Sequence, residues 1–537
     1  MPHAALSQAE ILAAVAHLVS GHGPVKRIDT HASIVFLAGE RALKIKRAVT
    51  FPFLDYSTLE RRKDACEAEI SVNRPLAPQI YKGVVAITRE KDGSLRIGGG
   101  GTPIEWAVDM VRFDETATLD KLAERRLIDD KLADDLARAV VSAHKNAPNA
   151  NAEDWLAAFR LFIAQNEDAF RSNSNLFRLD EIEALTALSL NAFENNHALL
   201  LKRGASGFVR RLHGDLHLGN IVLLTDQPVL FDAIEFDPLV ATGDVLYDLA
   251  FLIMDLVERD LRSAANIVLN RYLQQSDDVS NLDTLAAMPL FLSMRAAIRA
   301  KVTAARCERV EAIERPLLRE LAKTYFRLAL AFLNPAPPIL LAIGGLSGTG
   351  KSVLAIKMAP ALGSVPGAVV LRSDIERKRL FGVGELTALP AEAYAHQVTK
   401  SVYSSLARNA ERVIQAGHSV LVDAVYADAN ERKVIAKVAA VRQVAFRGIF
   451  LAANLETRLS RVADRSGDAS DADRTVVLQQ SKYDSGTLDW LAVDASGTPE
   501  ETLVAAQKQL ATDLGRPEIF SPPNHVHSTS SPTGLVP

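Results

Sequence analysis

Apolar residues gather in short continuous runs in the last third of the chain. One run, 339–343, follows a segment with three prolines at 334–338, and further runs stand at 368–371, 419–422, 445–451 and 491–493. Runs of this length are typical of parallel strands buried on both faces, and the helix-like segments between them favour crossover connections. We therefore predict a Pro-rich linker at 334–338 and an α/β domain with a parallel sheet over 339–515.

The first 333 residues show a different order of patterns. Residues 31–113 are rich in strand patterns and contain one helical stretch, whereas most of 118–333 is helical apart from a strand-rich patch at 208–236. This order predicts an α+β domain over 1–333, in which a small sheet lobe precedes a larger helical lobe. The last segment, 516–537, is rich in Ser, Pro and Thr, and we predict that it is disordered.

Composition bears on the partners and the cellular compartment of the protein. Of 537 residues, 61 are Lys or Arg and 65 are Asp or Glu, and this net charge of −4 argues against a nucleic-acid partner, which needs a broad basic footprint. Two cysteines, Cys66 and Cys307, cannot build a disulfide framework, which favours a reducing compartment. No apolar stretch approaches the roughly 20 residues of a membrane span, and Gln8 and Glu10 interrupt any signal-peptide pattern. We expect a cytoplasmic protein, and these patterns indicate no oligomeric state.

The segment 345–352 reads Gly-Leu-Ser-Gly-Thr-Gly-Lys-Ser, which fits the phosphate-loop pattern G-x-x-x-x-G-K-[ST] at every fixed position. Glycines let backbone N–H groups converge on phosphate oxygens, and the start of the predicted helix adds partial positive charge. We expect Lys351 to act catalytically on the β- and γ-phosphates and the Ser352 hydroxyl to bind Mg²⁺. The predicted nucleotide-binding residues are Gly345, Ser347, Gly348, Thr349, Gly350, Lys351 and Ser352.

Two aspartates follow predicted strands of the same sheet. Ser373 and Glu376 have capping-box spacing, so we expect Asp374 in the first turn of a helix at the carboxyl edge of the sheet, where ligands of α/β proteins bind. Asp374 is a candidate to accept the proton of an attacking hydroxyl; the alternative is a residue favoured only by the helix dipole. Asp423 ends the apolar segment 420–423, which is the pattern of a Walker B strand that holds Mg²⁺.

Arg458, Arg461 and Arg465 have the spacing of one helix face and precede an acid-rich loop at 467–473. This arrangement predicts a catalytic arginine lid over the transferring phosphate, with a solvated basic face as the alternative. Together with the phosphate loop and Asp374, it resembles the small P-loop kinases of the gluconate-kinase, polynucleotide-kinase and zeta-toxin-like group. The resemblance covers about residues 339–515 and implies phosphoryl transfer from ATP with Mg²⁺.

A second motif lies in the α+β region. Residues 213–220 read His-Gly-Asp-Leu-His-Leu-Gly-Asn, the H-x-D-x-x-x-x-N spacing of the catalytic loop of protein-kinase-like folds. Asp215 is expected to orient or deprotonate an acceptor hydroxyl, and Asn220 to bind a metal ion. Asp232 follows the apolar segment 229–230, at the spacing of a hairpin that returns its carboxylate to the same metal ion.

These residues resemble the aminoglycoside-phosphotransferase family, in which H-G-D-x-H-x-x-N precedes an I-D-x-x-E/D segment and a G-D-x-x-x-D-L-A run. Here residues 213–220, 232–237 and 243–250 stand in those places. The resemblance covers most of residues 25–330 in lobe order and implies a two-lobed protein-kinase-like fold.

Such a kinase needs a lysine of the sheet lobe on the α- and β-phosphates, paired with a glutamate on the following helix. We prefer Lys44 to Lys46, which shares its strand face, and Glu69 to Glu67. No G-x-G-x-x-G loop covers the phosphates, and residues 30–33 occupy that place.

Both halves therefore indicate transfer of a γ-phosphoryl group from ATP with Mg²⁺. Their order resembles a bacterial family of fused proteins with a phosphotransferase-like part followed by a P-loop kinase part. We predict an ATP-dependent kinase with two kinase-like domains that act on hydroxyl groups of small molecules. Two other hypotheses stay open: a nucleotide-dependent switch or ATPase with an N-terminal pseudokinase that binds a ligand, and a polynucleotide 5′-kinase.

Overall fold

The computed structural model describes residues 6–514, except 22, 52–53, 277, 309, 465–466 and 484–485. The chain forms two compact units: the first combines the described residues up to Phe162 with His197–Asp255, and the second combines Ile163–Asn196 with the described residues from Leu256 onward. The Pro-rich segment 334–338 thus lies inside the second unit, and the helices just before it share that unit with the parallel sheet. The predicted disordered tail at 516–537 lies outside the described residues.

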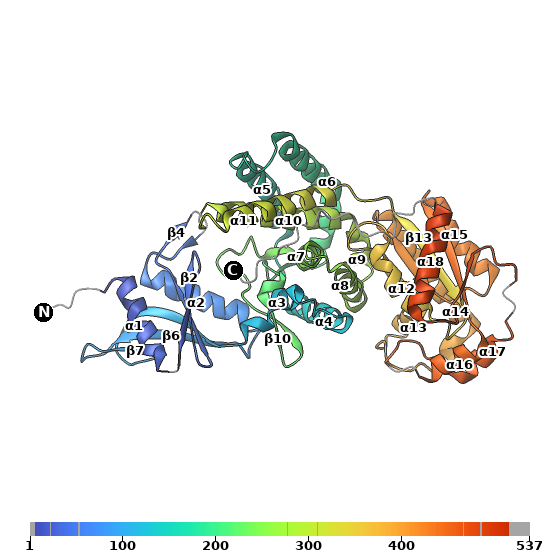
Figure 1. Ribbon diagram of the computed structural model, residues 1–537, viewed down its shortest axis with the longest axis horizontal. Coiled ribbons are helices and arrows are strands. Elements are labelled where there is room, and N and C mark those ends of the chain that lie inside the picture. Colours follow the sequence, from blue (N-terminus) through green and yellow to red (C-terminus); the bar gives the residue numbers. More distant parts are fainter. Residues whose placement is uncertain are drawn as a thin grey trace. The chain divides into compact units, whose positions relative to one another are not determined.

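The first unit contains a six-stranded antiparallel sheet in the order β1-β2-β3-β8-β6-β7 (Figure 1). Successive residues of β2 face opposite ways, so Phe36 packs toward α1 (Gln8–Ser20) and Leu37 toward α2 (Leu59–Asn73). The predicted sheet lobe with one internal helix is confirmed. Its strands are β1 (Val25–Asp29), β2 (Ser33–Ala38), β3 (Arg41–Lys46), β6 (Tyr81–Arg89), β7 (Leu95–Ile97) and β8 (Thr102–Val111), and β4 (Thr50–Phe51) pairs separately with β5 (Leu54–Asp55).

Helices and two short strand pairs complete the first unit. The pair of β10 (Ile221–Leu224) and β11 (Gln227–Leu230) lies in the predicted strand-rich patch, between two of the candidate site residues. The other elements are α3 (Leu119–Glu124), α4 (Asp130–Asn146), β9 (Val209–Arg211), β12 (Thr242–Asp244) and the helices α5 (Ala152–Arg171), α6 (Leu179–Ala205) and α7 (Val245–Glu258), which contain residues of both units.

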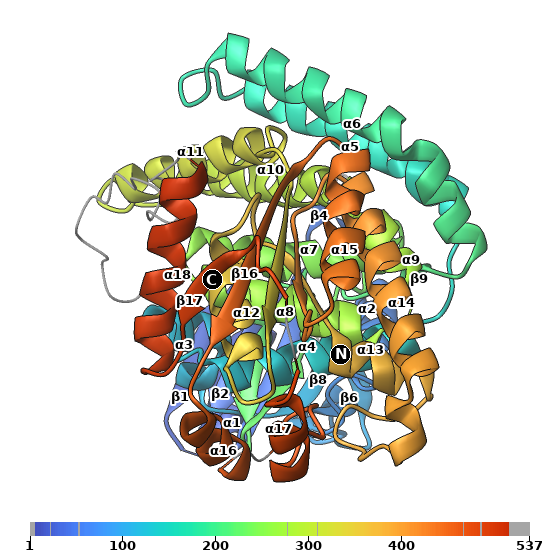
Figure 2. The same ribbon diagram turned by 90° about the vertical axis from the view of Figure 1, so that its right-hand side faces the viewer.

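The second unit is built on a five-stranded parallel sheet in the order β14-β15-β13-β16-β17 (Figure 2). All five predicted strands are confirmed, each within two residues of its expected ends. Parallel pairing buries both faces of the central strands, which explains why the sequence of β13 is apolar throughout. The strands are β13 (Ile339–Gly345), β14 (Val369–Arg372), β15 (Val420–Asp423), β16 (Ala445–Ala452) and β17 (Leu491–Asp494).

Helices cover both faces of this sheet. One face packs against α12 (Lys351–Met358) and α18 (Pro499–Leu514), and the other against α14 (His396–Gln415) and α15 (Ala429–Val441). The same unit contains α8 (Arg262–Gln275), α9 (Ser280–Thr284), α10 (Met288–Cys307), α11 (Arg315–Phe332), α13 (Ser373–Leu380), α16 (Leu455–Ala463) and α17 (Arg474–Gln480). In the part of the chain that the structure describes, no helix has the length and apolar character needed to cross a membrane.

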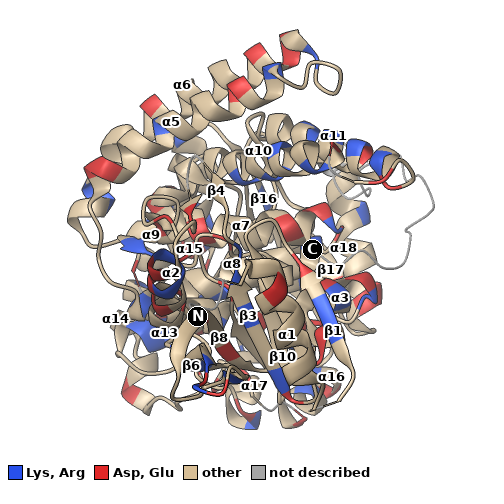
Figure 3. Cartoon of the chain, turned by 90° about the vertical axis from the view of Figure 1, so that its left-hand side faces the viewer, with Lys and Arg blue, Asp and Glu red and all other residues tan. Residues whose placement is uncertain are grey.

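Charged side chains are spread over many elements. In the cartoon of Figure 3, ribbon segments of Lys and Arg and of Asp and Glu both occur on many elements, and the basic ones do not collect on a single element. This distribution agrees with the near balance of charge in the sequence.

Candidate active sites

The phosphate loop connects β13 to α12, as predicted. Gly348 has φ +85°, and a Cβ atom at this position would lie 2.6 Å from the backbone oxygen of Arg458, so a side chain is excluded on two grounds. The Arg458 Nε donates a hydrogen bond to the carbonyl of Ser347 at 2.8 Å. The loop is therefore held against α16 by a close backbone approach and a charged hydrogen bond.

The end of the loop brings together a lysine, a hydroxyl and a carboxylate. Lys351 Nζ curls back to the carbonyl of Leu346 at 3.2 Å, and Ser352 Oγ donates to Asp423 Oδ2 at 2.5 Å. Asp423 is the last residue of β15, the neighbour of β13 in the sheet. Ser352 and Asp423 supply hard oxygen donors side by side, which fits the coordination preference of Mg²⁺.

Asp374 lies in the first turn of α13, directly after β14. The expected capping box is wrong: Arg372 is the N-cap residue, and Glu376 is buried and accepts a hydrogen bond from Ser405 at 2.5 Å. Glu376 is drawn into the interior because α13 packs against α14. Burial, together with the nearby Asp423 carboxylate, raises the pKa of Asp374, which is also hydrogen-bonded to Ser470.

The predicted lid arginines contact backbone carbonyls. Arg461 Nη1 donates to the carbonyl of Ala495 at 2.8 Å and lies 3.5 Å from that of Thr349, while Arg458 holds Ser347 as described. Both side chains thus brace the phosphate loop from α16. Arg465 lies outside the described residues. A direct role of these arginines at the transferring phosphate stays a prediction.

One cavity of about 1440 Å³ is large enough for a nucleotide and a second small molecule, and it is lined by 347–352, Asp374, Asp423 and Arg461 but not by Arg458. On the side of Asp374 the cavity is lined by residues that the sequence patterns did not single out: Arg377, Tyr394, Thr399, Tyr403, Asp428 and Glu431. Burial and the neighbouring Asp428 raise the pKa of Glu431 to about 7, and Tyr403 is hydrogen-bonded to it. Arg377 lies three residues after Asp374, in a D-x-x-R pattern. This spacing was the one feature of the sequence that could have pointed to Arg377.

Another missed residue links the strand end to the lid. Arg372 Nη2 donates to Asp468 at 2.8 Å, and its Nε lies 3.6 Å from Asp423. In the sequence, Arg372 simply precedes Ser373 and Asp374, and no motif there marks it as a site residue.

In the first unit, the catalytic loop is fixed by α7. Gly214 N–H donates to Asp248 at 3.0 Å, and Leu218 N–H donates to Asp255 at 2.9 Å. Within the loop, Asn220 Nδ2 donates to the carbonyl of Asp215 at 3.0 Å and to its carboxylate at 3.1 Å. Asp215 and Asn220 are therefore brought together as predicted.

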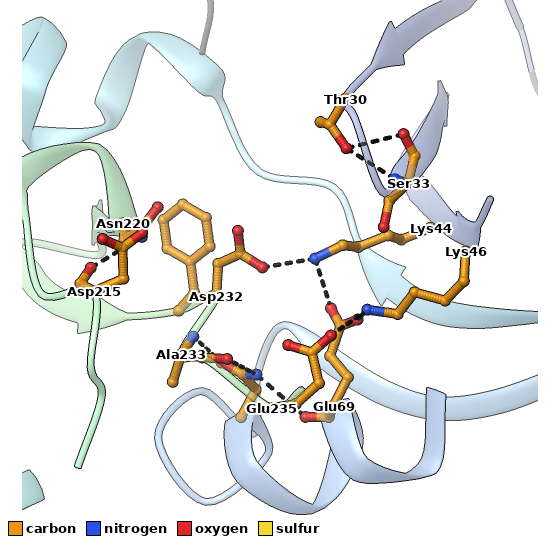
Figure 4. Close-up of polar contacts among 12 residues, drawn as sticks. Thr30, Ser33, Lys44, Lys46, Glu69, Asp215, Asn220, Asp232, Ala233 and Glu235 are labelled. Carbon is orange, nitrogen blue, oxygen red and sulfur yellow. Dashed lines mark hydrogen bonds and ion pairs between the residues drawn. The ribbon is translucent and has the colours of Figure 1, made fainter. Parts of the chain in front are cut away.

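The preferred lysine and glutamate also meet. Lys44 Nζ lies 2.9 Å from Glu69 Oε1 and 2.6 Å from Asp232 Oδ1, so one ammonium group joins β3, α2 and the segment after β11. Figure 4 shows the Asp232 carboxylate turned toward Lys44, whereas Asn220 pairs with Asp215. Asn220 and Asp232, the two metal-ligand candidates, are still close along the backbone. The N–H of Phe231, the residue before Asp232, donates to the carbonyl of Asn220 at 3.0 Å.

Asp232 has an unusual backbone conformation, with φ +59°. Its own N–H donates to Tyr81 Oη at 3.1 Å, and Asn73 clamps the next peptide by accepting from Ala233 N–H at 2.7 Å and donating to its carbonyl at 3.1 Å. The surrounding structure therefore imposes this conformation on the residue. The Asp232 carboxylate and the Asn220 side-chain carbonyl together offer two oxygen donors of the type that Mg²⁺ takes.

Lys46 makes ion pairs that the sequence did not reveal. It pairs with Glu69 Oε2 at 2.6 Å and with Glu235, and its side chain is only 2% exposed against 14% for Lys44. Burial opposes ionisation of Glu69, but its ion pairs with both lysines outweigh this and lower its pKa to about 2. The alternation of Lys44 and Lys46 on one strand face was the only signal of this double pairing.

Two family models match the chain. Residues 74–287 match the phosphotransferase enzyme family, and residues 340–484 match the AAA domain family. The chain thus contains a protein-kinase-like phosphotransferase domain and a P-loop kinase domain. The first match extends through α8, so a helix of the phosphotransferase region belongs to the same compact unit as the P-loop sheet.

Relatives share this arrangement over nearly their whole length. Uncharacterized proteins of Mycobacterium tuberculosis and Mycobacterium bovis are 27% identical to the chain over 500 residues, which cover 91% of this chain and 96% of each relative.

Similar solved structures match one region each. A gluconokinase from Sinorhizobium meliloti covers 34% of this chain and 97% of its own, with 18% identity and a TM-score of 0.25. A Plasmodium vivax ethanolamine kinase covers 57% and 81%, with 11% identity and a TM-score of 0.36. A mutant aminoglycoside 2′-phosphotransferase, solved as its GDP complex, covers 59% and 98%, with 14% identity and a TM-score of 0.36.

Proposed function

We propose that the protein is a phosphotransferase with two ATP- and Mg²⁺-dependent sites, each acting on a hydroxyl group of a small molecule. The observation that carries the proposal is the convergence of Lys351, the Ser352–Asp423 pair and Asp374 on one cavity at the carboxyl edge of a parallel sheet. A nucleotide site alone would need the loop and its hydroxyl. A partly buried carboxylate that lines the same cavity adds the group that phosphoryl transfer to a hydroxyl requires.

In the P-loop site, the backbone N–H groups of 347–352 and Lys351 bind the triphosphate. Mg²⁺ at Ser352 and Asp423 neutralises charge on the phosphate oxygens when it is bound. Asp374 accepts the proton of the acceptor hydroxyl and orients it toward the γ-phosphorus. Its raised pKa matches this task, because a more basic carboxylate takes the proton more readily.

In the first unit, Asp215 has the corresponding role and Asn220 fixes its carboxylate. Lys44 binds the phosphates, with Glu69 holding its ammonium group in place. His213 is buried, and burial lowers its pKa, so it serves as a neutral donor to the Phe231 carbonyl rather than as a proton acceptor. Asn220 and Asp232 are the metal-binding candidates of this site.

A small acceptor is favoured over a nucleic acid by the lining of the cavity near Asp374. Tyr394, Tyr403 and Glu431 offer hydroxyl and carboxyl groups that suit hydrogen bonding to a polar metabolite. Carboxylates there would repel a polyphosphate backbone.

The test uses the full chain with radiolabelled ATP, a metabolite pool and a set of oligonucleotides. Asp215→Asn, Asp374→Asn and the double variant separate the two sites, and Asp130→Asn is a surface control. We expect labelled small molecules from the wild type, with each single variant losing one subset by at least about 100-fold while nucleotide affinity is retained.

Three outcomes would contradict the proposal. Labelled oligonucleotide ends would establish a polynucleotide kinase, and free phosphate alone would establish a switch or ATPase. Labelled products that persist in a single variant at the wild-type rate would remove that aspartate from its assigned role.

A further inference from the structure

Helix α8 covers the open edge of the P-loop sheet. Strand β14 pairs only with β15, so its other edge presents backbone groups that need partners. Asn270 supplies them: its Oδ1 accepts from Val370 N–H at 2.7 Å, and its Nδ2 donates to the carbonyl of Ala368 at 3.1 Å. One side-chain amide therefore makes the two hydrogen bonds that a neighbouring strand would make.

The contact is buried as well as specific. Asn266, one turn earlier on α8 and only 2% exposed, donates a second hydrogen bond to the Ala368 carbonyl at 3.1 Å. Because β14 leads within two residues to Asp374, this ladder fixes the strand that carries the proposed proton acceptor. Figure 1 shows α8 beside α12, and α8 contacts the turn at 359–361 that follows α12.

The last turn of α8 reaches a second part of the site. Arg271 Nη1 and Gln274 Nε2 both lie 2.5 Å from Glu385 Oε2, in the segment between α13 and α14. The backbone carbonyl of Glu385 accepts from Lys378 Nζ at 2.6 Å. Lys378 is only 2% exposed, so its charge depends on these partners.

Lys378 passes the connection to the lid loop. Its Nζ also lies 3.0 Å from Asp471, which accepts from Leu389 N–H at 3.1 Å and from Tyr394 Oη at 2.6 Å. Asp471 follows Ser470, the hydrogen-bond partner of Asp374. A continuous polar network thus runs from α8 through Glu385 and Lys378 to the lid and to both sides of the acceptor region.

We propose that α8, a helix of the phosphotransferase region, positions the acceptor side of the P-loop site, with Asn270 and Arg271 as positioning residues. The inference rests on the proposed function of that site. Asn270 fixes β14 and hence Asp374, and Arg271 fixes segment 381–394 and, through Lys378, the loop at 467–473. None of the hydrogen bonds from α8 to Asp471 involves the phosphate loop, and the loop at 467–473 reaches Ser352 only indirectly, through Asp468, Arg372 and Asp423. We therefore expect nucleotide binding to change little when these contacts are lost.

The experiment measures hydrogen–deuterium exchange of the full chain with AMP-PNP and Mg²⁺. In Arg271→Met we expect exchange in both 381–394 and 467–473 to become about tenfold faster, as the loss of a hydrogen bond to a charged group implies. Protection of 345–352 by the nucleotide should not change. Arg271→Lys should restore slow exchange, because a cation again faces Glu385.

The matched control is Arg442→Met. Arg442 pairs with Glu411 at 2.8 Å, is partly exposed like Arg271 though more so (33% against 20%), and its pair lies in neither segment. Asn270→Leu is an independent arm, which should speed exchange of 368–380 and lower turnover at the P-loop site without changing the KM for ATP.

Two results would overturn the inference. Faster exchange confined to 381–394, with 467–473 at the wild-type rate, would reduce Arg271 to a local support. Equal effects of Arg442→Met would make the change unspecific. Failure of AMP-PNP to protect 345–352 in the wild type would instead refute the proposed nucleotide site, and the exchange coupling would still be readable without nucleotide.

Discussion

Replacing Lys46 should destabilise the first unit far more than replacing Lys44, although both lysines contact Glu69. Lys46→Met leaves the buried Glu235 without its lysine, and Glu69 keeps only Lys44. Breaking a buried pair in this way typically costs about 3–5 kcal/mol. Lys44→Met leaves Glu69 with Lys46, and its other partner, Asp232, is 44% exposed and can be hydrated.

The pKa of Glu69 shows the same balance of forces. Its ordinary value is 4.5, and Lys44 and Lys46 together lower it to about 2 against the effect of burial. For a unit of this size, a loss of about 3–5 kcal/mol lowers the melting temperature by about 6–20 °C.

The assay is thermal unfolding of the full chain, with the transition of the first unit identified by hydrogen exchange in α2. Lys131→Met is the matched control, because Lys131 is 74% exposed and water screens its 2.6 Å pair with Asp135, so its loss should leave stability almost unchanged. Lys44→Met should instead abolish transfer at the first site. If Lys46→Met unfolded at the same temperature as Lys131→Met, the ion pairs of Lys46 with Glu69 and Glu235 would not stabilise the first unit.

Three further predictions concern pH and metal dependence. Because Glu69 has a lowered pKa in the folded state, its stabilisation is fully present above about pH 4.5 and is lost as the pH falls toward 2; acid titration of unfolding should show this, and Glu69→Gln should not. Because burial and Asp423 raise the pKa of Asp374, a pH–rate profile of the P-loop site should lose activity on the acid side at a pH above 3.8, and an acid limb at or below that value would contradict the assignment. Ser352→Ala should weaken AMP-PNP binding about tenfold with Mg²⁺ and leave it unchanged in EDTA, as measured by calorimetry.

Local patterns predicted the parts of this protein whose structure depends on neighbours in the chain. The phosphate loop, the strands of the parallel sheet and the pairing of Asp215 with Asn220 all follow from short segments with fixed spacing. A glycine-rich turn between a buried strand and a helix has few alternative conformations, so its sequence specifies its shape.

The failed capping box shows where such reasoning ends. Ser373 and Glu376 have the right spacing, but α14 brings Ser405 and Asn409 to Glu376, and the buried hydrogen bonds win over the local cap. The preference for Lys44 over Lys46 had little support in the sequence, since the two share a strand face. The tertiary structure distinguishes them, because Asp232 approaches Lys44 and Glu235 approaches Lys46.

The sequence alone thus predicted the two motifs proposed to bind phosphate and the order of the lobes, because these are encoded within contiguous segments. The tertiary structure decided which carboxylates face which cations and that α8 completes the edge of the P-loop sheet. Several of those contacts, such as Lys46 with Glu235 and Asn270 with Val370, join residues about 100 or more positions apart, and no local spacing encodes a meeting of that kind.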